Sequence, residues 1–269
     1  MPELPEVETV KNGLQDLSGT TVTEVIIRFP QLRYKIDQTE LNKMLGQQVK
    51  AITRRAKYLL IHFEHGVLII HLGMSGRITL YKNTPPEVLK HDHVDITFNH
   101  YTLRYNDPRR FGCIIFSEDL DKLSLVANLG PEPFSDEFNY TYLKNKLINR
   151  NTPIKQLIMD NAIVVGVGNI YACESLFLTG ISPLTPGKKL TATQCRKLVE
   201  NIQLVLQNAI NAGGSSLRDY KSATGELGYF QISHNVYGRA KLPCKKCETI
   251  IQEVRLGQRN SFYCPNCQK

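Results

Sequence analysis

Two Cys-x-x-Cys pairs near the C-terminus constrain the fold of this chain more than any other feature. Sixteen residues separate the second cysteine from the third. This spacing is typical of a structural zinc site, whose ligands would be Cys244, Cys247, Cys264 and Cys267. The alternative is four thiols that hold no metal. Because four thiolates fill a tetrahedral shell, one Zn²⁺ per chain would stabilise the fold without taking part in chemistry.

The residues between the two cysteine pairs predict a β-hairpin. Strand-like runs occupy 250–254 and 261–263, and Gly257 lies between them. Arg259 would therefore lie at the tip of the hairpin. The other three cysteines stand alone in the sequence, and we interpret them as packed thiols of a protein in a reducing compartment.

The first half of the chain is predicted to be mainly β-structure. Its strand-like runs are rich in β-branched and aromatic residues and are separated by turn signals. They span 22–29, 58–63, 67–72, 94–98, 102–105 and 112–116. Between residues 6 and 17, apolar residues recur at three- and four-residue spacing, which predicts a helix. We expect a β-sandwich or a barrel with flanking helices.

The second half follows a linker at Gly130-Pro131-Glu132-Pro133, where two prolines interrupt regular structure. Beyond it, the apolar spacing becomes helical. Pro153 can open one helix, and Asn169 can cap another that extends to Leu178. A capping box at 191–194 precedes a third, amphipathic helix.

That third helix is predicted to end at Gly213-Gly214. The polar, glycine-bearing stretch 215–233 shows no periodicity and is predicted to be a loop. The chain would thus consist of an N-terminal domain at 1–130, a helical domain at 131–234 and a zinc module at 235–269.

The first residues, Met1-Pro2-Glu3, carry a chemical signal. Aminopeptidases remove methionine before proline, which would leave a secondary amine at the terminus. An α-amino group has a pKa of roughly 8, so part of it is an unprotonated nucleophile at cellular pH. With the neighbouring Glu3 as a general acid, it could form a catalytic pair. The alternative is a solvated terminus without a catalytic role.

Composition favours an acidic partner. The 269 residues carry a formal charge of +8 and a pI near 9.1, and basic residues cluster at 54–57, 109–110 and 245–246. We interpret Lys188-Lys189 as a solvated face. The hydrophobic content of 42% can fill substantial cores. No stretch is long and apolar enough to span a bilayer, so we expect a cytoplasmic protein that does not bind membranes.

Several segments resemble the bacterial formamidopyrimidine-DNA glycosylases, in family order and along nearly the whole chain. They are Pro2–Thr9, Arg54–Leu60, His71–Gly76, Lys90–His93, Asp107–Gly112, Gly166–Tyr171 and Gln258–Cys267. The resemblance implies an α+β multidomain protein. It would contain an N-terminal β-sandwich, a helix-two-turn-helix domain around the glycine-rich turn at 166–169, and a four-cysteine zinc ribbon.

The resemblance also implies an activity and its catalytic residues. The protein would be a bifunctional glycosylase and AP lyase of base excision repair, acting as a monomer on damaged double-stranded DNA in the bacterial nucleoid. Pro2 would attack C1′ and form an iminium, while Glu3 donates a proton to the sugar. Lys57 would serve β-elimination and Arg259 δ-elimination. We expect Arg259 to bind phosphate, because its guanidinium stays protonated.

Further positions match DNA contacts of the family. They are His91, Arg109, Arg150, Lys155 and Asn169, together with the wedge residues Met74, Arg109 and Phe111 that fill the vacated stack. The loop at 215–233 would cap the extruded base. Taken singly, Lys57 could be a surface charge, His91 and His93 structural, and Met74 and Phe111 core residues.

Three positions depart from the family pattern, and two other functions remain open. Arg150 replaces a common lysine, and Lys241 and Asn260 replace glycine or small residues, which questions local turn geometry. One alternative is an endonuclease VIII-like glycosylase acting on oxidised pyrimidines. The other is a zinc-ribbon protein that binds lesions without cutting. The preferred function is excision of oxidised purines, 8-oxoguanine opposite cytosine and formamidopyrimidines.

Overall fold

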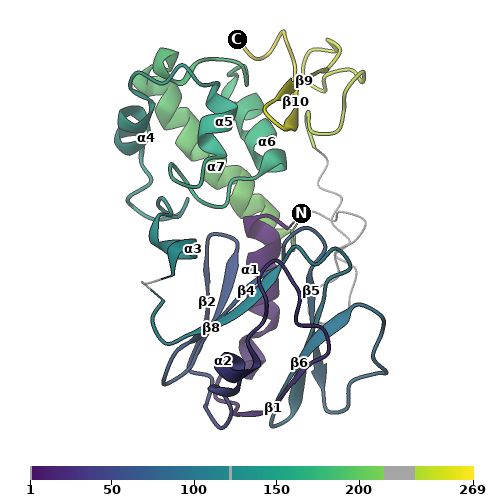
Figure 1. Ribbon diagram of the computed structural model, residues 1–269. Coiled ribbons are helices and arrows are strands. Elements are labelled where there is room, and N and C mark those ends of the chain that lie inside the picture. The colour runs from purple at the N-terminus through teal and green to yellow at the C-terminus, as the bar shows by residue number, and fades with distance from the viewer. Residues whose placement is uncertain (1, 121–122, 215–233) are drawn as a thin grey trace. The chain divides into compact units, whose positions relative to one another are not determined.

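The computed structural model describes residues 2–120, 123–214 and 234–269 (Figure 1). These residues form two compact units. The first unit holds 2–120, 123–127 and 212–214, and the second holds 128–211 and 234–269. The predicted capping loop, 215–233, lies outside the described residues.

Two antiparallel four-stranded sheets make up most of the first unit, in the orders β1-β6-β7-β5 and β2-β3-β4-β8. Their strands are β1 (Val22–Ile27), β2 (Ala51–Arg55), β3 (Tyr58–His62), β4 (Val67–His71), β5 (Arg77–Lys82), β6 (Asp92–Phe98), β7 (Tyr101–Asn106) and β8 (Cys113–Ser117). The helices are α1 (Leu4–Gly13), the 3₁₀ turn η1 (Gln15–Leu17), α2 (Gln38–Asn42) and α3 (Ser124–Ala127).

One hydrophobic core joins both sheets. Alternate residues of each strand face it, as strand geometry requires. Its members include Leu59, Ile61 and Ile70 from one sheet, Val94, Ile96 and Leu103 from the other, and Val7 and Val10 from α1. Each such side chain contributes about 1.5–3 kcal/mol by burial. Since neither sheet shares a strand with the other, the first unit is a sandwich and not a barrel.

All six predicted strands are present, but two others were not predicted. β2 ends in two arginines and β5 begins and ends with basic residues, so both sequences read as charged surface. The predicted helix at 6–17 begins earlier, at Leu4, and stops at Gly13. Its start differs because Glu3 serves as the N-cap, which proline at the first turn permits.

Helices form most of the second unit. They are α4 (Tyr140–Leu147), α5 (Ile154–Ile158), α6 (Asn169–Thr179), the 3₁₀ turn η2 (Gly187–Lys189) and α7 (Ala192–Asn211). Helix α7 packs against α4 and α6, and α5 packs against α6. Their apolar faces share one buried core. Among the helices of the described residues, none is long and apolar enough to cross a membrane.

The starts of α6 and α7 show one wrong and one confirmed prediction. Asn169 is not the cap of α6; Gly168 is, and Asn169 is the first helical residue. Gly166 precedes it with φ +81°, a conformation that favours glycine. The capping box before α7 is confirmed, because Thr191 N donates to Gln194 Oε1 at 2.9 Å and Gln194 N donates to Thr191 Oγ1 at 3.2 Å.

The zinc module is a short β-hairpin beside α6. Strand β9 (Gln252–Leu256) pairs with β10 (Arg259–Tyr263), and the pair Leu256 with Arg259 closes the turn. Gly257 in this turn has φ +59°. The hairpin shares only a small apolar cluster with Cys173 and Phe177 of α6, so burial alone stabilises it weakly.

Candidate functional site

The N-terminal residues are attached firmly to the start of α1. Glu3 is buried, at 4% exposure, and its backbone N donates to Glu6 Oε2 at 2.7 Å. In return, the Glu3 side chain accepts from the backbone N of Glu6, which completes a capping box. Pro2 is half-buried and directly precedes this cap. A nucleophile at Pro2 would therefore have a fixed neighbour with a carboxyl group.

Lys57 lies in the two-residue turn between β2 and β3, where Ala56 has φ +53°. Arg54 supports this turn from inside, because its Nη1 donates to the Ala56 carbonyl at 2.8 Å and its Nε donates to Glu8 Oε2 at 2.6 Å. Glu8 belongs to α1. Burial raises the pKa of Glu8, but hydrogen bonds from Lys11 and Arg54 more than offset this and hold it below its ordinary value. The Lys57 turn is thus fastened to the helix that follows Pro2.

The residues predicted to form the wedge lie in two turns that touch. Gly73 has φ +61°, and a Cβ there would lie 2.4 Å from the backbone carbon of Phe111. Only glycine permits this approach. Met74 follows in the first turn, while the Arg109 guanidinium stacks over the Phe111 ring at 4.8 Å. Phe111 is 49% exposed, so it is not a core residue.

Asp107 organises the second of these turns. It is fully buried, and its Oδ2 accepts from Gly112 N at 2.9 Å and from the Tyr105 hydroxyl at 3.2 Å. Its Oδ1 accepts from the Ser75 hydroxyl at 2.6 Å, and Ser75 Oγ accepts in turn from Arg109 N at 3.1 Å. The sequence showed Asp107-Pro108 only as a motif. The turn-forming pair was the available signal for this role.

His71 lies behind the wedge, in a pocket of about 330 Å³ lined also by Arg33, Gly73, Met74 and Phe111. Burial, with Arg33 and Lys57 nearby, lowers the pKa of His71 to about 4. Its Nδ1 therefore carries a lone pair, which accepts from Gly73 N at 3.0 Å. A neutral imidazole thus fixes the turn that leads to Met74.

His91 and His93 differ. His93 is buried, and its Nε2 is 2.8 Å from the Asp107 carbonyl, which fits the structural alternative. His91 is half-buried at the end of the 83–91 loop, and its carbonyl accepts from Asp107 N at 3.1 Å. The structure thus brings His91 to the turn that carries Arg109.

Lys155 and Asn169 meet in the second unit. Lys155 is 1% exposed, and its Nζ donates to Asn169 Oδ1 at 2.6 Å, to Ser261 Oγ at 2.6 Å and to the Asn260 carbonyl at 3.2 Å. Asn169 Nδ2 donates to the same carbonyl at 3.1 Å. These bonds join α5, the start of α6 and β10, so they fix the residue that follows Arg259.

Arg259 and Arg150 are both exposed. Arg259 is the first residue of β10, directly after the hairpin turn, as expected. Arg150 lies between α4 and α5, and its carbonyl accepts from Lys188 N at 2.9 Å. Both guanidinium groups are in positions from which they could bind an anion.

The four predicted cysteine ligands come together. Their Sγ atoms all lie within 4.8 Å of one another, and three of the separations are 3.3, 3.5 and 4.0 Å. Zinc–sulfur bonds of 2.3 Å in a tetrahedron require sulfurs about 3.8 Å apart. Backbone N–H groups of Lys246 and Cys267 each approach a sulfur at 3.4 Å. The donor set therefore fits a tetrahedral Zn²⁺.

Glu174 anchors the first residues of the zinc module. It is 5% exposed and accepts hydrogen bonds from Asn235, Val236 and Tyr237 backbone N–H groups at 2.8–2.9 Å. We did not identify this role from the sequence. A carboxylate within the otherwise apolar helix α6 was the signal.

Three family models match the chain. A formamidopyrimidine-DNA glycosylase N-terminal domain matches residues 1–114, and the H2TH domain of the same family matches 129–221. A zinc finger found in FPG and IleRS matches 241–269.

Individual proteins match over their full length. The formamidopyrimidine-DNA glycosylase of Methylobacillus flagellatus is 50% identical, covering 100% of this chain and 97% of the relative, and that of Pasteurella multocida is 48% identical, covering 100% of both. A complex of Lactococcus lactis Fpg with DNA containing an abasic site has a TM-score of 0.90 at 33% identity, covering 100% of both chains. MutM (Fpg) of Thermus thermophilus has a TM-score of 0.88 at 37% identity, covering 99% and 98%.

Proposed function

This chain belongs to the formamidopyrimidine-DNA glycosylase family, and we propose that it is a bifunctional DNA glycosylase and AP lyase for oxidised purines. Its substrates would be 8-oxoguanine opposite cytosine and formamidopyrimidines in double-stranded DNA. A related Lactococcus lactis Fpg mutant has been solved with DNA that contains Fapy-dG. The observation that carries the proposal is Pro2 directly before the buried cap Glu3.

The proposed reaction begins when the Pro2 nitrogen, freed by removal of Met1, attacks C1′ of the damaged nucleotide. The bond between C1′ and the base breaks, and the base leaves with a proton that balances the one lost by the Pro2 nitrogen. Glu3 donates a proton to the ring oxygen of the sugar as the ring opens, which leaves an iminium between Pro2 and C1′. The capping box supports this role, because it fixes the carboxyl group beside the nucleophile.

Strand cleavage follows from the charge of that iminium. The cation acidifies the C2′ proton, whose loss expels the 3′ phosphate in β-elimination. A second elimination expels the 5′ phosphate. We assign Lys57 to the first elimination and Arg259 to phosphate binding in the second. The fastening of the Lys57 turn to α1 through Arg54 and Glu8 supports the first assignment.

DNA binding would use both units. Proposed contacts are His91, Arg109, Arg150, Lys155 and Asn169, and the wedge is Met74, Arg109 and Phe111. The contact between the Gly73 and Phe111 turns supports the wedge, because such groups offset the few kcal/mol that base flipping costs. Lys155 would act through Asn169, whose side chain it holds at the start of α6, and the loop 215–233 would cap the flipped base.

The remaining assignments concern organisation. We place the domain boundaries at 130 and 234, and one structural Zn²⁺ on Cys244, Cys247, Cys264 and Cys267, which their geometry supports. The zinc would hold the ribbon together and supply no chemistry to the reaction. We propose that the protein acts as a monomer in the bacterial cytoplasm on nucleoid DNA, where thiols stay reduced.

Excision from two duplexes tests the substrate class. We expect release of 8-oxoguanine opposite cytosine to be faster than release of thymine glycol. The reverse order would indicate the endonuclease VIII-like function. A protein that binds both duplexes but cuts neither would be a lesion-binding protein.

A variant tests the nucleophile. Pro2→Gly should lose base excision by about a thousandfold or more, as expected when a covalent catalyst is removed, while its thermal unfolding stays close to wild type. The matched control is Pro5→Ala, which changes a proline in α1 that takes no part in the chemistry. Full excision by Pro2→Gly would refute the assignment.

A further inference from the structure

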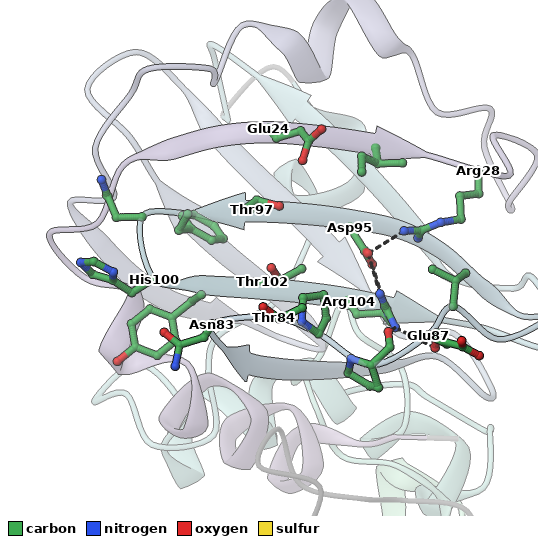
Figure 2. Close-up of a pocket in the computed structure, with 17 residues that line it drawn as sticks. Glu24, Arg28, Asn83, Thr84, Glu87, Asp95, Thr97, His100, Thr102 and Arg104 are labelled. Carbon is green, nitrogen blue, oxygen red and sulfur yellow. Dashed lines mark hydrogen bonds and ion pairs between the residues drawn. The ribbon is translucent and has the colours of Figure 1, made fainter.

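A polar groove lies on the face of sheet β1-β6-β7-β5 that points away from the sandwich core (Figure 2). Its volume is about 600 Å³. The wall of the groove is the connection between β5 and β6, residues 83–91, which contains no helix or strand. Tertiary contacts must therefore set the conformation of this loop, because it has no backbone ladder of its own.

Arg104 on β7 makes those contacts from beneath the loop. Its Nη1 donates to the Pro86 carbonyl at 2.8 Å and lies 3.4 Å from the Glu87 carbonyl. Its Nε and Nη2 donate to the two carboxylate oxygens of Asp95 at 2.9 and 2.8 Å. At 4% exposure, the guanidinium acts only through its protein partners. A bidentate pair of this kind fixes both distance and orientation.

Asp92 holds the far end of the loop. Its Oδ2 accepts from Leu89 N at 2.8 Å and lies 3.6 Å from Arg104 Nη1, while its Oδ1 accepts from Asn106 Nδ2 at 2.8 Å. Loop carbonyls are thus bound by a buried cation, and a loop N–H by a buried anion. Because carbonyl groups need donors and N–H groups need acceptors, this arrangement of charges favours one conformation of the loop backbone.

Arg28 completes the charge group without touching the loop in any contact the structure shows. Its Nη2 lies 2.6 Å from Asp95 Oδ2, on the other side of Asp95 from the loop, as Figure 2 shows. Burial raises the pKa of Asp95, but the bonds from Arg104 and Arg28 hold it below its ordinary value. Asp95 therefore has two cationic partners, of which Arg104 also binds the loop.

The loop ends at His91, whose carbonyl accepts from Asp107 N. Its last residues are Leu89, 70% exposed, then Lys90 and His91. Leu89, whose N–H is bound by Asp92, is two residues from His91. A shift of the loop backbone at Leu89 would therefore also move His91. The Asp107 turn beside it carries Arg109, the other proposed DNA contact of this region.

We infer that Arg104 is a positioning residue for DNA binding, which holds the 83–91 loop so that His91 lies beside the Arg109 turn. This inference rests on the proposed function. Arg104 contributes nothing to the bond-breaking steps. Because Arg104 orders the loop before DNA binds, His91 is already in place. Binding then does not have to bear the entropic cost of ordering the loop.

Two matched variants separate positioning from general stability. Arg104→Met and Arg28→Met each remove one of the two guanidinium groups that bind Asp95. Only Arg104→Met also removes the donor to the loop carbonyls. We expect Arg104→Met to raise the Kd for a duplex containing a tetrahydrofuran abasic analogue by about tenfold, and Arg28→Met by less than twofold. The single-turnover excision rate at saturating DNA should be unchanged in both.

A double-mutant cycle supplies the decisive comparison. If Arg104 acts through His91, Arg104→Met should weaken binding little further in a His91→Ala background. If Arg104→Met does not fold, Asp92→Asn serves instead, because it keeps the guanidinium groups but deprives either the Leu89 N–H or the Asn106 amide of its acceptor. We expect a smaller increase in Kd that also vanishes in the His91→Ala background.

Three results would overturn the inference: equal effects of Arg104→Met and Arg28→Met, full additivity with His91→Ala, or unchanged affinity of His91→Ala itself. A wild-type protein that neither binds nor cuts damaged duplex would instead refute the proposed function.

Discussion

The two units hold their proposed site residues in different ways. In the first, Glu3, Lys57 and the wedge turns are fastened by buried polar groups to a large sandwich core. In the second, Arg259 lies at the tip of a two-stranded hairpin over a small apolar cluster. A two-stranded hairpin alone is at best marginally stable in water. The metal site and the Lys155 bonds must supply what burial does not.

This difference indicates a division of labour. The groups proposed to attack and protonate the sugar belong to the part whose order depends on its own core. The group proposed to bind the second phosphate belongs to the part that we propose is ordered by a structural Zn²⁺. Loss of the metal should therefore affect DNA binding and the last elimination more than base excision.

Metal removal has the largest expected effect on DNA affinity. Structural zinc contributes about 10–16 kcal/mol to the folding of small zinc modules. Cys247→Ala should therefore lose zinc and disorder the hairpin, and its affinity for damaged duplex should fall by about a hundredfold or more. Filter binding and metal analysis measure both quantities. Cys195→Ala, which changes a buried cysteine of α7, is the control.

The first unit should be insensitive to that change. Thermal unfolding of Cys247→Ala should keep a transition for the sandwich near that of the wild type. A metal-free protein with undiminished DNA affinity would contradict the account of the ribbon.

His71 gives the next largest effect, in the first unit. Its pKa of about 4 lies below the ordinary 6.5, so the unfolded chain binds its proton at a higher pH than the folded one. The stability it contributes is therefore complete well above pH 6.5 and is lost as the pH falls towards 4, by at most about 3.4 kcal/mol. Urea unfolding at several pH values measures this. His71→Asn can still accept from Gly73 N but does not titrate, so its stability should fall less over that interval.

The bond between Glu8 and Arg54 should matter less. Glu8→Gln keeps an acceptor but loses the ion pair, and hydrogen bonds to charged groups contribute about 1.5–3 kcal/mol when buried. Because Arg54 is 9% and Glu8 17% exposed, we expect the lower end of that range. The rate of β-elimination on a preformed abasic site should fall several-fold. If the free energy of unfolding falls but the rate of β-elimination does not change, the bond between Glu8 and Arg54 does not position Lys57 for that step.

The smallest effect concerns one exposed cation of the second unit. Arg150→Ala should weaken binding a few-fold and reduce the slope of log affinity against log salt by about one, as expected for one lost phosphate contact. Lys188→Ala, on the face interpreted as solvated, should leave the slope unchanged. Equal slopes for both variants would remove Arg150 from the interface.

Sequence patterns predicted the parts of this molecule whose residues are close together in the chain. The cysteine spacing predicted that the four cysteines come together, the runs of β-branched residues predicted six strands, and residues 191–194 predicted a capping box. Each depends on local geometry. The resemblance to a known family supplied the site residues, which neither periodicity nor spacing indicates.

The interactions that fasten the site could not be predicted in this way. Asp107 and Arg104 collect partners from segments far apart in the sequence, and Glu174 anchors residues about sixty positions away. Asp107-Pro108 marks a turn and Glu174 is a carboxylate in a largely apolar helix, but neither local signal identifies the distant partners. The helix at Asn169 starts one residue earlier than expected, because the Asn169 side chain bonds to Lys155 and Asn260 and does not cap the helix.

Covalent trapping tests the central claim most directly. The protein is incubated with a duplex containing 8-oxoguanine opposite cytosine and with borohydride, which reduces an iminium to a stable amine, and the adduct is located by peptide mass. We predict DNA attached to Pro2 after removal of Met1. An adduct on Lys57 or another lysine, or none despite confirmed removal of Met1, would contradict the account.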